Sequence, residues 1–175
     1  MAEQESLLDY WKTHKEIRFE SFEENAGRIV SARLFAGSDL LNGILEIAKK
    51  HKIRAGIVHV AFGSLSKTEI RLAERGHDTK SGGKRSEPKT IEGPISVLCG
   101  QGKVGVPKEG EPVIHMHGVV ADTKGRVWGG HLFPDENPVY ATLEVVIQEI
   151  QGLEFALMYD PLVGEKLLQT RRIED

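Results

Sequence analysis

The sequence predicts an α+β fold, with a mostly antiparallel sheet of about seven or eight strands packed by one long helix. Short segments rich in β-branched residues recur along the chain, and clusters of Gly, Pro, Asn and Asp separate them. Only residues 40–51 combine a broad apolar helical face with a capping residue before it. A doubly wound parallel fold needs several such helices, so we expect antiparallel connections.

The composition is that of an ordinary globular chain of 175 residues, long enough for one domain with a substantial core. Its formal net charge of −3 argues against a dedicated nucleic-acid binder, which is normally basic. The single cysteine, Cys99, fits a reducing compartment. Residues 1–5 lack the features of a signal peptide, and no apolar run reaches the ~18 residues of a membrane span. We therefore expect a cytoplasmic protein.

Three parts divide the chain: an N-terminal arm at 1–26, the main domain at 27–150, and a C-terminal strand and tail at 151–175 that belong to the same domain. The arm is charged and amphipathic, and we expect a short helix followed by a strand at 17–22. Docking of the arm onto the domain and a solvated extension are both open alternatives.

The main domain begins with an alternating strand at 27–35, and the helix at 40–51 follows it. Ser38 or Asp39 can cap the first amide groups of this helix. The predicted helix ends in Lys49, Lys50 and His51, and these side chains suit the negative end of the helix dipole.

The next segment, 55–64, is apolar on both faces apart from His59, which predicts a fully buried strand. A turn at Gly63-Ser64 then leads to a half-exposed strand at 67–72. Between Ala73 and Thr90 large apolar residues are absent, and this composition predicts a mobile loop.

A strand at 91–99 runs into residues 100–105, which match the pattern G-x-G-x-x-G. Dinucleotide binding needs a helix N-terminus directly after this pattern, and prolines follow it here. We therefore assign these glycines to a hairpin or a bulge. Further strands are predicted at 139–150, for which a helix is the alternative, and at 153–159, before a charged tail.

Residues 113–132 gather three of the seven histidines into one predicted β-hairpin. Asp122-Thr-Lys-Gly125 has the signature of a type I turn whose Gly takes the left-handed conformation. Closure at this turn pairs Asp122 with Arg126, and the same register then places His131 opposite His117. The other face of the hairpin is apolar and should pack on the core; it carries Ile114, Met116, Val120, Trp128 and Leu132.

The three histidines share one face of this hairpin, because His115 and His117 are two residues apart on a strand. Opposed residues hold their Cβ atoms roughly 4.5–5.5 Å apart and diagonal neighbours roughly 7–8 Å apart. The imidazoles of His115, His117 and His131 can therefore converge on one ion, with room left beside Gly129. Without a fourth protein ligand in the hairpin, they describe an open Zn²⁺ site that also takes water or substrate. The alternative is a set of ordinary polar residues on a solvated face.

Six segments stand out in order: Gly27-Arg-Ile-Val-Ser-Ala-Arg-Leu34, Gly37-Ser-Asp-Leu-Leu41, His59-Val-Ala-Phe-Gly-Ser-Leu65, Gly93-Pro-Ile-Ser-Val-Leu98, Ile114-His-Met-His-Gly118 and Gly129-Gly-His-Leu132. Together they resemble the PPC domain, the plants and prokaryotes conserved domain of unknown function, over residues 27–150. The resemblance is to its prokaryotic stand-alone type. It implies a homotrimer, an antiparallel sheet packed by one long helix, and zinc binding. It also implies a remote similarity to acetolactate decarboxylase, a zinc enzyme, which says nothing about the substrate.

Plant members of this family carry AT-hook segments of Arg-Gly-Arg-Pro type that grip the minor groove of DNA. The 175 residues contain no such segment, so the resemblance does not bring DNA binding with it. The plant domains generally lack the three histidines, whereas prokaryotic members that resemble this chain carry them.

The leading hypothesis is a zinc-binding homotrimer that holds the metal through His115, His117 and His131 and binds or acts on a small molecule. Glu144 is the candidate general base or partner of a metal ligand, and Arg33 is the candidate contact for a carboxylate or phosphate. For Arg33, a surface or interface ion pair is the alternative. Whether the protein is an enzyme stays open.

Two other hypotheses remain from the sequence. One is a DNA-binding or regulatory module in which the metal is structural and the basic loop near Lys84 and Arg85 makes the contacts. The other is a trimeric scaffold without chemistry, in which the apolar strands bury the contacts between subunits.

Overall fold

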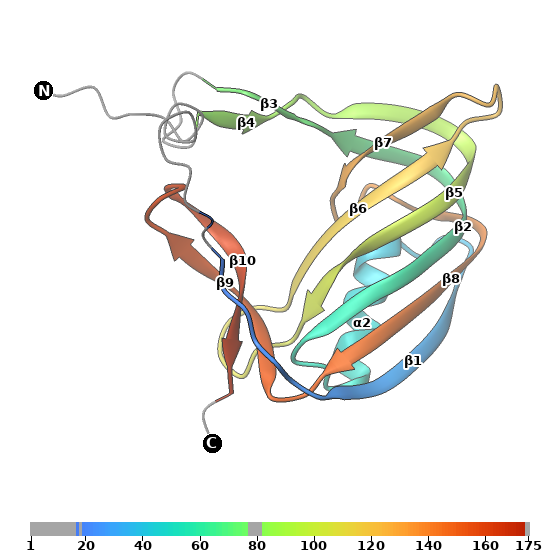
Figure 1. Ribbon diagram of the computed structural model, residues 1–175. Coiled ribbons are helices and arrows are strands. Elements are labelled where there is room, and N and C mark those ends of the chain that lie inside the picture. The colour runs from blue at the N-terminus through green and yellow to red at the C-terminus, as the bar shows by residue number, and fades with distance from the viewer. Residues whose placement is uncertain (1–16, 18, 77–81, 174–175) are drawn as a thin grey trace, which may run out of the picture.

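A computed structural model describes residues 17, 19–76 and 82–173 of the chain. The described residues form β-strands and one short helix (Figure 1). In chain order the elements are β1 (Ala26–Phe35), α2 (Leu40–His51), β2 (Gly56–Arg71), β3 (Ala73–Arg75), β4 (Gly83–Arg85), β5 (Lys89–Gly105), β6 (Val113–Ala121), β7 (Val127–Leu132), β8 (Val139–Ile150), β9 (Leu153–Asp160) and β10 (Glu165–Arg172). The predicted class, a mostly antiparallel sheet with a helix, is confirmed.

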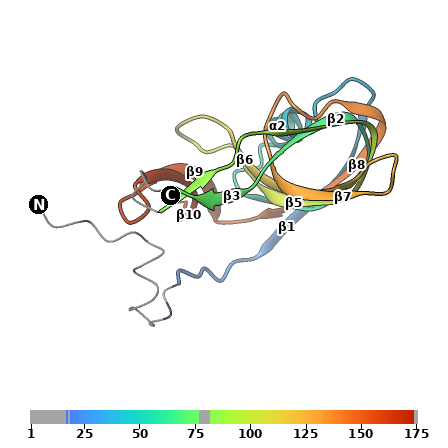
Figure 2. The ribbon, with the colours of Figure 1, turned by 90° about the horizontal axis from the view of Figure 1, so that it is seen from above.

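Six strands form the main sheet in the order β1-β8-β2-β5-β6-β7, and every pairing in it is antiparallel. The far end of β2 also pairs with β7, through Ile70 opposite Leu132 and Arg71 opposite His131. This second pairing makes the sheet curl around α2, as the view from above shows (Figure 2). The strand pairs β3–β4 and β9–β10 form two small separate sheets.

The helix is short, 12 residues, and not the long helix that the sequence predicted. Asp39, and not Ser38, caps it, because the Asp39 carboxylate accepts hydrogen bonds from the amides of Leu41 at 3.0 Å and Asn42 at 2.9 Å. The same carboxylate accepts the amide of Asn137 at 2.8 Å, which ties the helix start to the segment before β8. No helix among the described residues is long and apolar enough to cross a membrane.

The core lies between α2 and the inner face of the curled sheet. The helix contributes its apolar face, and alternate residues of the strands point toward it. Its fully buried members include Leu40, Ile44, Val58, Leu65, Met116, Leu132, Leu143 and Ile147. A smaller cluster of Ala55, Val113, Leu153 and Phe155 joins the β9–β10 pair to the main sheet.

Glu154 anchors the β9–β10 pair and is 4% exposed. Its carboxylate accepts hydrogen bonds from Arg54 at 2.5 Å, from Arg171 at 2.6 Å and from the amide of Lys108 at 3.0 Å. Burial on its own would raise the pKa of Glu154, but these donors outweigh burial and lower it, so the carboxylate stays ionised. The β10 strand stands where the sequence predicted a charged tail.

The predicted turn at Gly63-Ser64 is wrong, because β2 runs unbroken from Gly56 to Arg71. Register shifts along β2 mark irregularities that let the strand continue through this glycine. The strand is also not fully buried: His59 is exposed and Phe62 is 51% exposed, because they point away from α2.

Three other expectations change. The glycines at 100–105 continue β5 instead of forming a hairpin or bulge, and β5 approaches β6 closely there. The segment expected as a mobile loop contains the β3–β4 hairpin, with 77–81 outside the described residues. The described residues of the expected strand at 17–22 are not in a strand, and the expected arm helix lies outside the described residues.

Candidate metal centre

The hairpin of β6 and β7 has the predicted register, with His117 opposite His131. Its closure also follows the prediction, because the amide of Asp122 donates to the carbonyl of Arg126 at 3.0 Å. The amide of Gly125 donates to the carbonyl of Asp122 at 2.9 Å, and Gly125 has a φ of 74°. This left-handed conformation is one that residues with a Cβ rarely adopt, so glycine belongs at this position.

The Asp122 side chain holds the turn together and is 5% exposed. It accepts hydrogen bonds from the amides of Lys124 at 2.9 Å and Arg126 at 3.0 Å, and from the Arg126 side chain at 2.7 Å. Burial on its own would raise the pKa of Asp122, but these donors and Trp128 lower it to about 2. The turn therefore contains a carboxylate that is ionised across the physiological range.

The opposite face of the hairpin packs on the core as predicted. Met116, Val120 and Leu132 are buried, while Ile114 and Trp128 are partly buried against the same cluster. Because side chains alternate along a strand, this packing fixes the three histidines on the outer face. The fold thus provides a rigid platform for the imidazoles.

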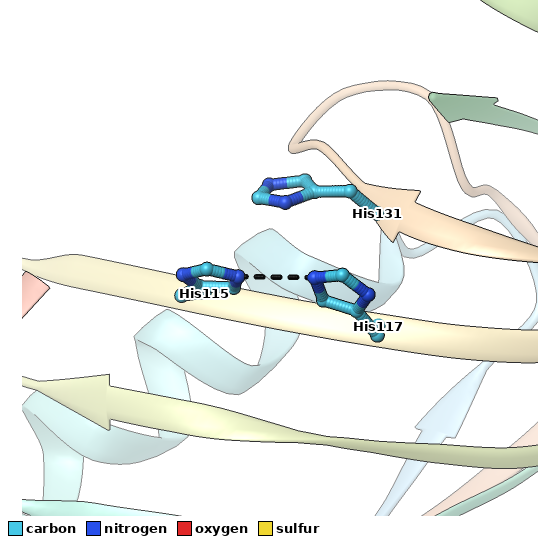
Figure 3. A group of neighbouring side chains, drawn as sticks. All are labelled: His115, His117 and His131. Atoms are coloured by element: carbon cyan, nitrogen blue, oxygen red, sulfur yellow. Dashed lines mark hydrogen bonds between the residues drawn. The ribbon is translucent and has the colours of Figure 1, made fainter. Parts of the chain in front are cut away.

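The three imidazoles gather in one place (Figure 3). Their ligand atoms all lie within 4.8 Å of one another, and Nε2 of His115 lies 3.1 Å from Nε2 of His117. A tetrahedral zinc site with Zn–N bonds of about 2.0–2.1 Å separates its nitrogen ligands by about 3.3 Å. His115 and His117 already have nearly this spacing, and the ligand atom of His131 lies within 4.8 Å of theirs. The donor set fits a metal ion such as Zn²⁺.

Neutral imidazole, the form that binds a metal, is favoured at this site. Burial lowers the pKa of His131 to about 4, and the nearby charges of His115, Arg85, His117 and Arg71 add to the effect. Burial also lowers the pKa of His115, together with His117, Arg85 and Lys103. At these two positions a metal ion therefore rarely has to displace a proton from the imidazole ring.

A groove of about 280 Å³ opens beside His117, so the histidine cluster is accessible from the surface. Gly129, expected to leave room beside the histidines, is part of its wall. The groove is lined by Cys99, Gln101, His117, Gly118, Val119, Gly129 and Gly130. A few non-hydrogen atoms of a ligand fit there beside His117.

Cationic and aromatic side chains border His131, and the sequence reasoning did not find them. Phe133 stacks on the His131 ring with centroids 4.3 Å apart. The Arg71 guanidinium lies 4.4 Å from the centroid of Phe133, and the Arg85 guanidinium lies 5.5 Å from it. Arg71 reaches this place because the end of β2 pairs with β7, a contact between distant segments that no local sequence pattern signals.

The structure places Glu144 and Arg33 elsewhere on the sheet. They pair with each other across β8 and β1, and the Arg33 side chain donates to the Glu144 carboxylate. Strands β2 and β5 lie between β8 and the histidine-bearing β6. The ion pair, which was the alternative for Arg33, accounts for both charges within the chain.

The family model of the Plants and Prokaryotes Conserved (PCC) domain matches residues 21–151. A curated relative, the bifunctional protein GlmU of Synechococcus sp. (strain JA-3-3Ab), is 32% identical over 148 residues. The match covers 85% of this chain and 21% of that relative. The chain therefore spans about a fifth of the length of the curated relatives it matches.

Solved structures with the same fold include the metal-containing protein AF0104 from Archaeoglobus fulgidus. It has a TM-score of 0.71 and 24% identity, and the match covers 86% of this chain and 99% of that one. A "Putative DNA-binding protein" from Ralstonia eutropha JMP134 has a TM-score of 0.64 and 22% identity, with 79% and 89% covered. At these identities the likeness shows the fold alone.

Proposed function

Because this chain belongs to the Plants and Prokaryotes Conserved (PCC) domain family, we propose that it is a zinc-binding homotrimer whose three-histidine site keeps a position open for a small molecule. The observation that carries this proposal is the convergence of His115, His117 and His131, with all ligand atoms within 4.8 Å. The metal-containing relative from Archaeoglobus fulgidus, which shares the fold, supports it.

The donor set favours an open site over a closed structural one. Closed zinc sites complete four ligands with Cys, His or carboxylate, whereas the group found among the described residues contains three histidines only. When bound, the metal supplies a Lewis acid or lowers the pKa of a coordinated water. The protein's own part is to hold three imidazoles on a rigid hairpin and to leave the groove beside His117 open.

Exposed apolar side chains on the sheet face away from α2 support self-association. On neighbouring strands of this face, Phe35 is 68% exposed, Phe62 51%, Leu98 52% and Tyr140 56%. Large apolar side chains that stay exposed on neighbouring strands are typical of a surface that binds another subunit. A measured molar mass of one chain in solution, by light scattering, would reject the homotrimer.

We also propose a cytoplasmic location, which the free and exposed thiol of Cys99 supports. The similarity of the fold to acetolactate decarboxylase stays a prediction of the family resemblance, and no reaction is transferred from it. The activities of GlmU are likewise not assigned to this chain, which corresponds to 21% of that protein.

Metal content tests the zinc proposal directly. Purified wild-type protein is expected to contain one Zn²⁺ per chain by elemental mass spectrometry, and His117→Ala is expected to lose it. His59→Ala is the matched control, since His59 is an exposed strand histidine that contacts Gln148 and lies outside the cluster. Wild-type protein that holds no zinc and takes none up on dialysis would reject the proposal.

A DNA-binding or regulatory module is the second candidate, with the metal in a structural role. The exposed Arg75, Lys84 and Arg85 of the β3–β4 hairpin are the observation in its favour, together with the relative from Ralstonia eutropha. The net charge of −3 opposes it. In a gel-shift assay, affinity that falls steeply with salt would support this candidate, and no shift at low salt would remove it.

A further inference from the structure

Two arginines beside the histidines differ from most of the other described arginines. Most described arginines pair with a carboxylate: Arg28 with Glu149, Arg33 with Glu144, Arg54 and Arg171 with Glu154, Arg126 with Asp122, and Arg172 with Glu24. Among the described residues, Arg71, Arg75 and Arg85 have no such partner, and of these Arg71 and Arg85 lie beside the ring of Phe133 that stacks on His131. The Nε atom of Arg71 is moreover buried and has no hydrogen-bond acceptor within the described part of the chain.

Both guanidinium groups are held at the edge of the metal position. Arg71 sits directly opposite His131 in the pairing of β2 with β7, so its backbone is fixed relative to that ligand. Both arginines lie against the ring of Phe133, which itself stacks on His131 at 4.3 Å. The carbonyl of Phe133 accepts a hydrogen bond from Asn137 at 2.5 Å, and Asn137 is fully buried. The platform beneath the arginines is therefore anchored.

This arrangement is electrostatically unfavourable without an anion. A bound divalent cation would add two positive charges beside Arg71 and Arg85, and Lys103 lies opposite His115 on the next strand. These positive charges would repel one another. A buried arginine N–H group without a hydrogen-bond acceptor costs additional free energy. Arginine groups matched to a carboxylate or phosphate form short, charge-assisted hydrogen bonds that offset these costs.

We propose that Arg71 and Arg85 bind the anionic group, a carboxylate or a phosphate, of the small molecule that occupies the open position of the three-histidine site. The inference rests on the proposed metal-binding function and adds to it the charge of the ligand. The groove beside His117 provides space for the ligand, and the arginines beside His131 select a ligand that carries a negative charge. The anion-binding role expected for Arg33 thus falls to two other arginines.

The test measures anion binding by calorimetry on zinc-loaded protein that has been dialysed free of excess metal. Inorganic phosphate and pyruvate are the two probes, one for each anionic group. The variants are Arg71→Gln and Arg85→Gln. Lys124→Gln is the matched control, because it removes one positive charge from the same hairpin at the exposed turn, about 20 Å from the histidines at the ~3.3 Å rise per strand residue.

Zinc content and circular dichroism are recorded for every variant before the titration. At least one probe is expected to bind wild-type and Lys124→Gln protein equally, and about tenfold more weakly to each arginine variant, because each loses a charge-assisted hydrogen bond. The probe that binds more tightly identifies the anionic group.

Unchanged affinity of both arginine variants, with zinc content intact, would overturn the inference and leave the metal proposal standing. The same conclusion follows if neither anion binds zinc-loaded wild type. Wild-type protein that takes up no zinc would reject the proposed function itself, and the inference with it.

Discussion

His117 on β6 lies directly opposite His131 on β7, with ring centroids 5.1 Å apart. This pairing is decided by the turn that joins the two strands, which begins at Asp122, five residues after His117, and ends at Arg126, five residues before His131. A shift of one residue at the turn would send one of the two histidines to the core face. The chemistry of the site therefore depends on a turn that lies outside the histidine cluster.

The first prediction concerns Asp122, whose carboxylate holds this turn. Asp122→Asn is expected to lower the thermal midpoint and the zinc affinity, because the amide cannot satisfy all the donors that meet the carboxylate. The pKa of Asp122 is lowered to about 2, so the folded state favours the ionised form. Its contribution to stability is present above the unfolded pKa of about 3.9 and is lost as the pH falls toward 2.

Thermal unfolding of wild type and Asp122→Asn at several pH values checks this prediction. The two midpoints should differ most above about pH 4, where an unfolded Asp is ionised, and should converge as the pH approaches the native pKa. Thr123→Ala, at an exposed position of the same turn, is the control. A midpoint difference that does not change with pH would contradict the assignment of this carboxylate.

The second prediction is the titration of the metal-free site. Because burial lowers the pKa of His131 to about 4, its ring should stay neutral well below the usual pKa of about 6.5. His115 should titrate below the usual range as well. Native stability should accordingly fall as the pH drops from about 6.5 toward the native pKa, since the unfolded state binds the protons more readily.

Two-dimensional NMR of histidine ring protons, on protein treated with a chelator, gives these midpoints directly. The exposed His59 provides an internal comparison outside the cluster. A His131 midpoint at or above the usual value would show that the ring is solvated and that the cluster is looser than the structure shows.

The histidine hairpin could be predicted because its information is local. The turn signature fixed the register, strand alternation fixed the faces, and the apolar face of Met116, Val120 and Leu132 fixed which side is buried. The bounds of α2 and of β8 followed from local pattern in the same way. In each case the conformational preferences of neighbouring residues were enough to predict the element without knowledge of tertiary contacts.

The surroundings of the site could not be predicted because they depend on pairing between distant segments. Arg71 meets His131 only because β2 continues past Gly63 and curls onto β7. The Gly63-Ser64 pair alone predicts a turn, whereas the pairing of β2 with β5 and β8 on either side keeps it extended. The strand β10 forms by pairing with β9, although its own residues are mostly polar.

The third prediction tests the helix cap. Asp39→Ala is expected to reduce the free energy of unfolding by about 1–2 kcal/mol, because two helix amides lose their acceptor. The buried segment at Asn137 loses the same acceptor and adds to the cost. Ser38→Ala, the alternative cap, should change stability by less than about 0.5 kcal/mol. Urea unfolding of both variants measures the difference, and equal effects would contradict the assignment of the cap.

The fourth prediction concerns Glu144, which pairs with Arg33 on β1 and lies on a different part of the sheet from the histidines. Glu144→Gln is expected to leave the zinc content and zinc affinity unchanged. Its effect on the free energy of unfolding should lie within about 1 kcal/mol, because the pair is partly exposed, 58% for Arg33 and 28% for Glu144, and solvent screens it. Competition with a zinc chelator measures the zinc affinity. His117→Ala is the reference, because it shows how far the zinc affinity falls when a metal ligand is removed. A tenfold or larger drop in zinc affinity for Glu144→Gln would restore Glu144 as a partner of a metal ligand, and a subunit contact would then have to bring it to the site.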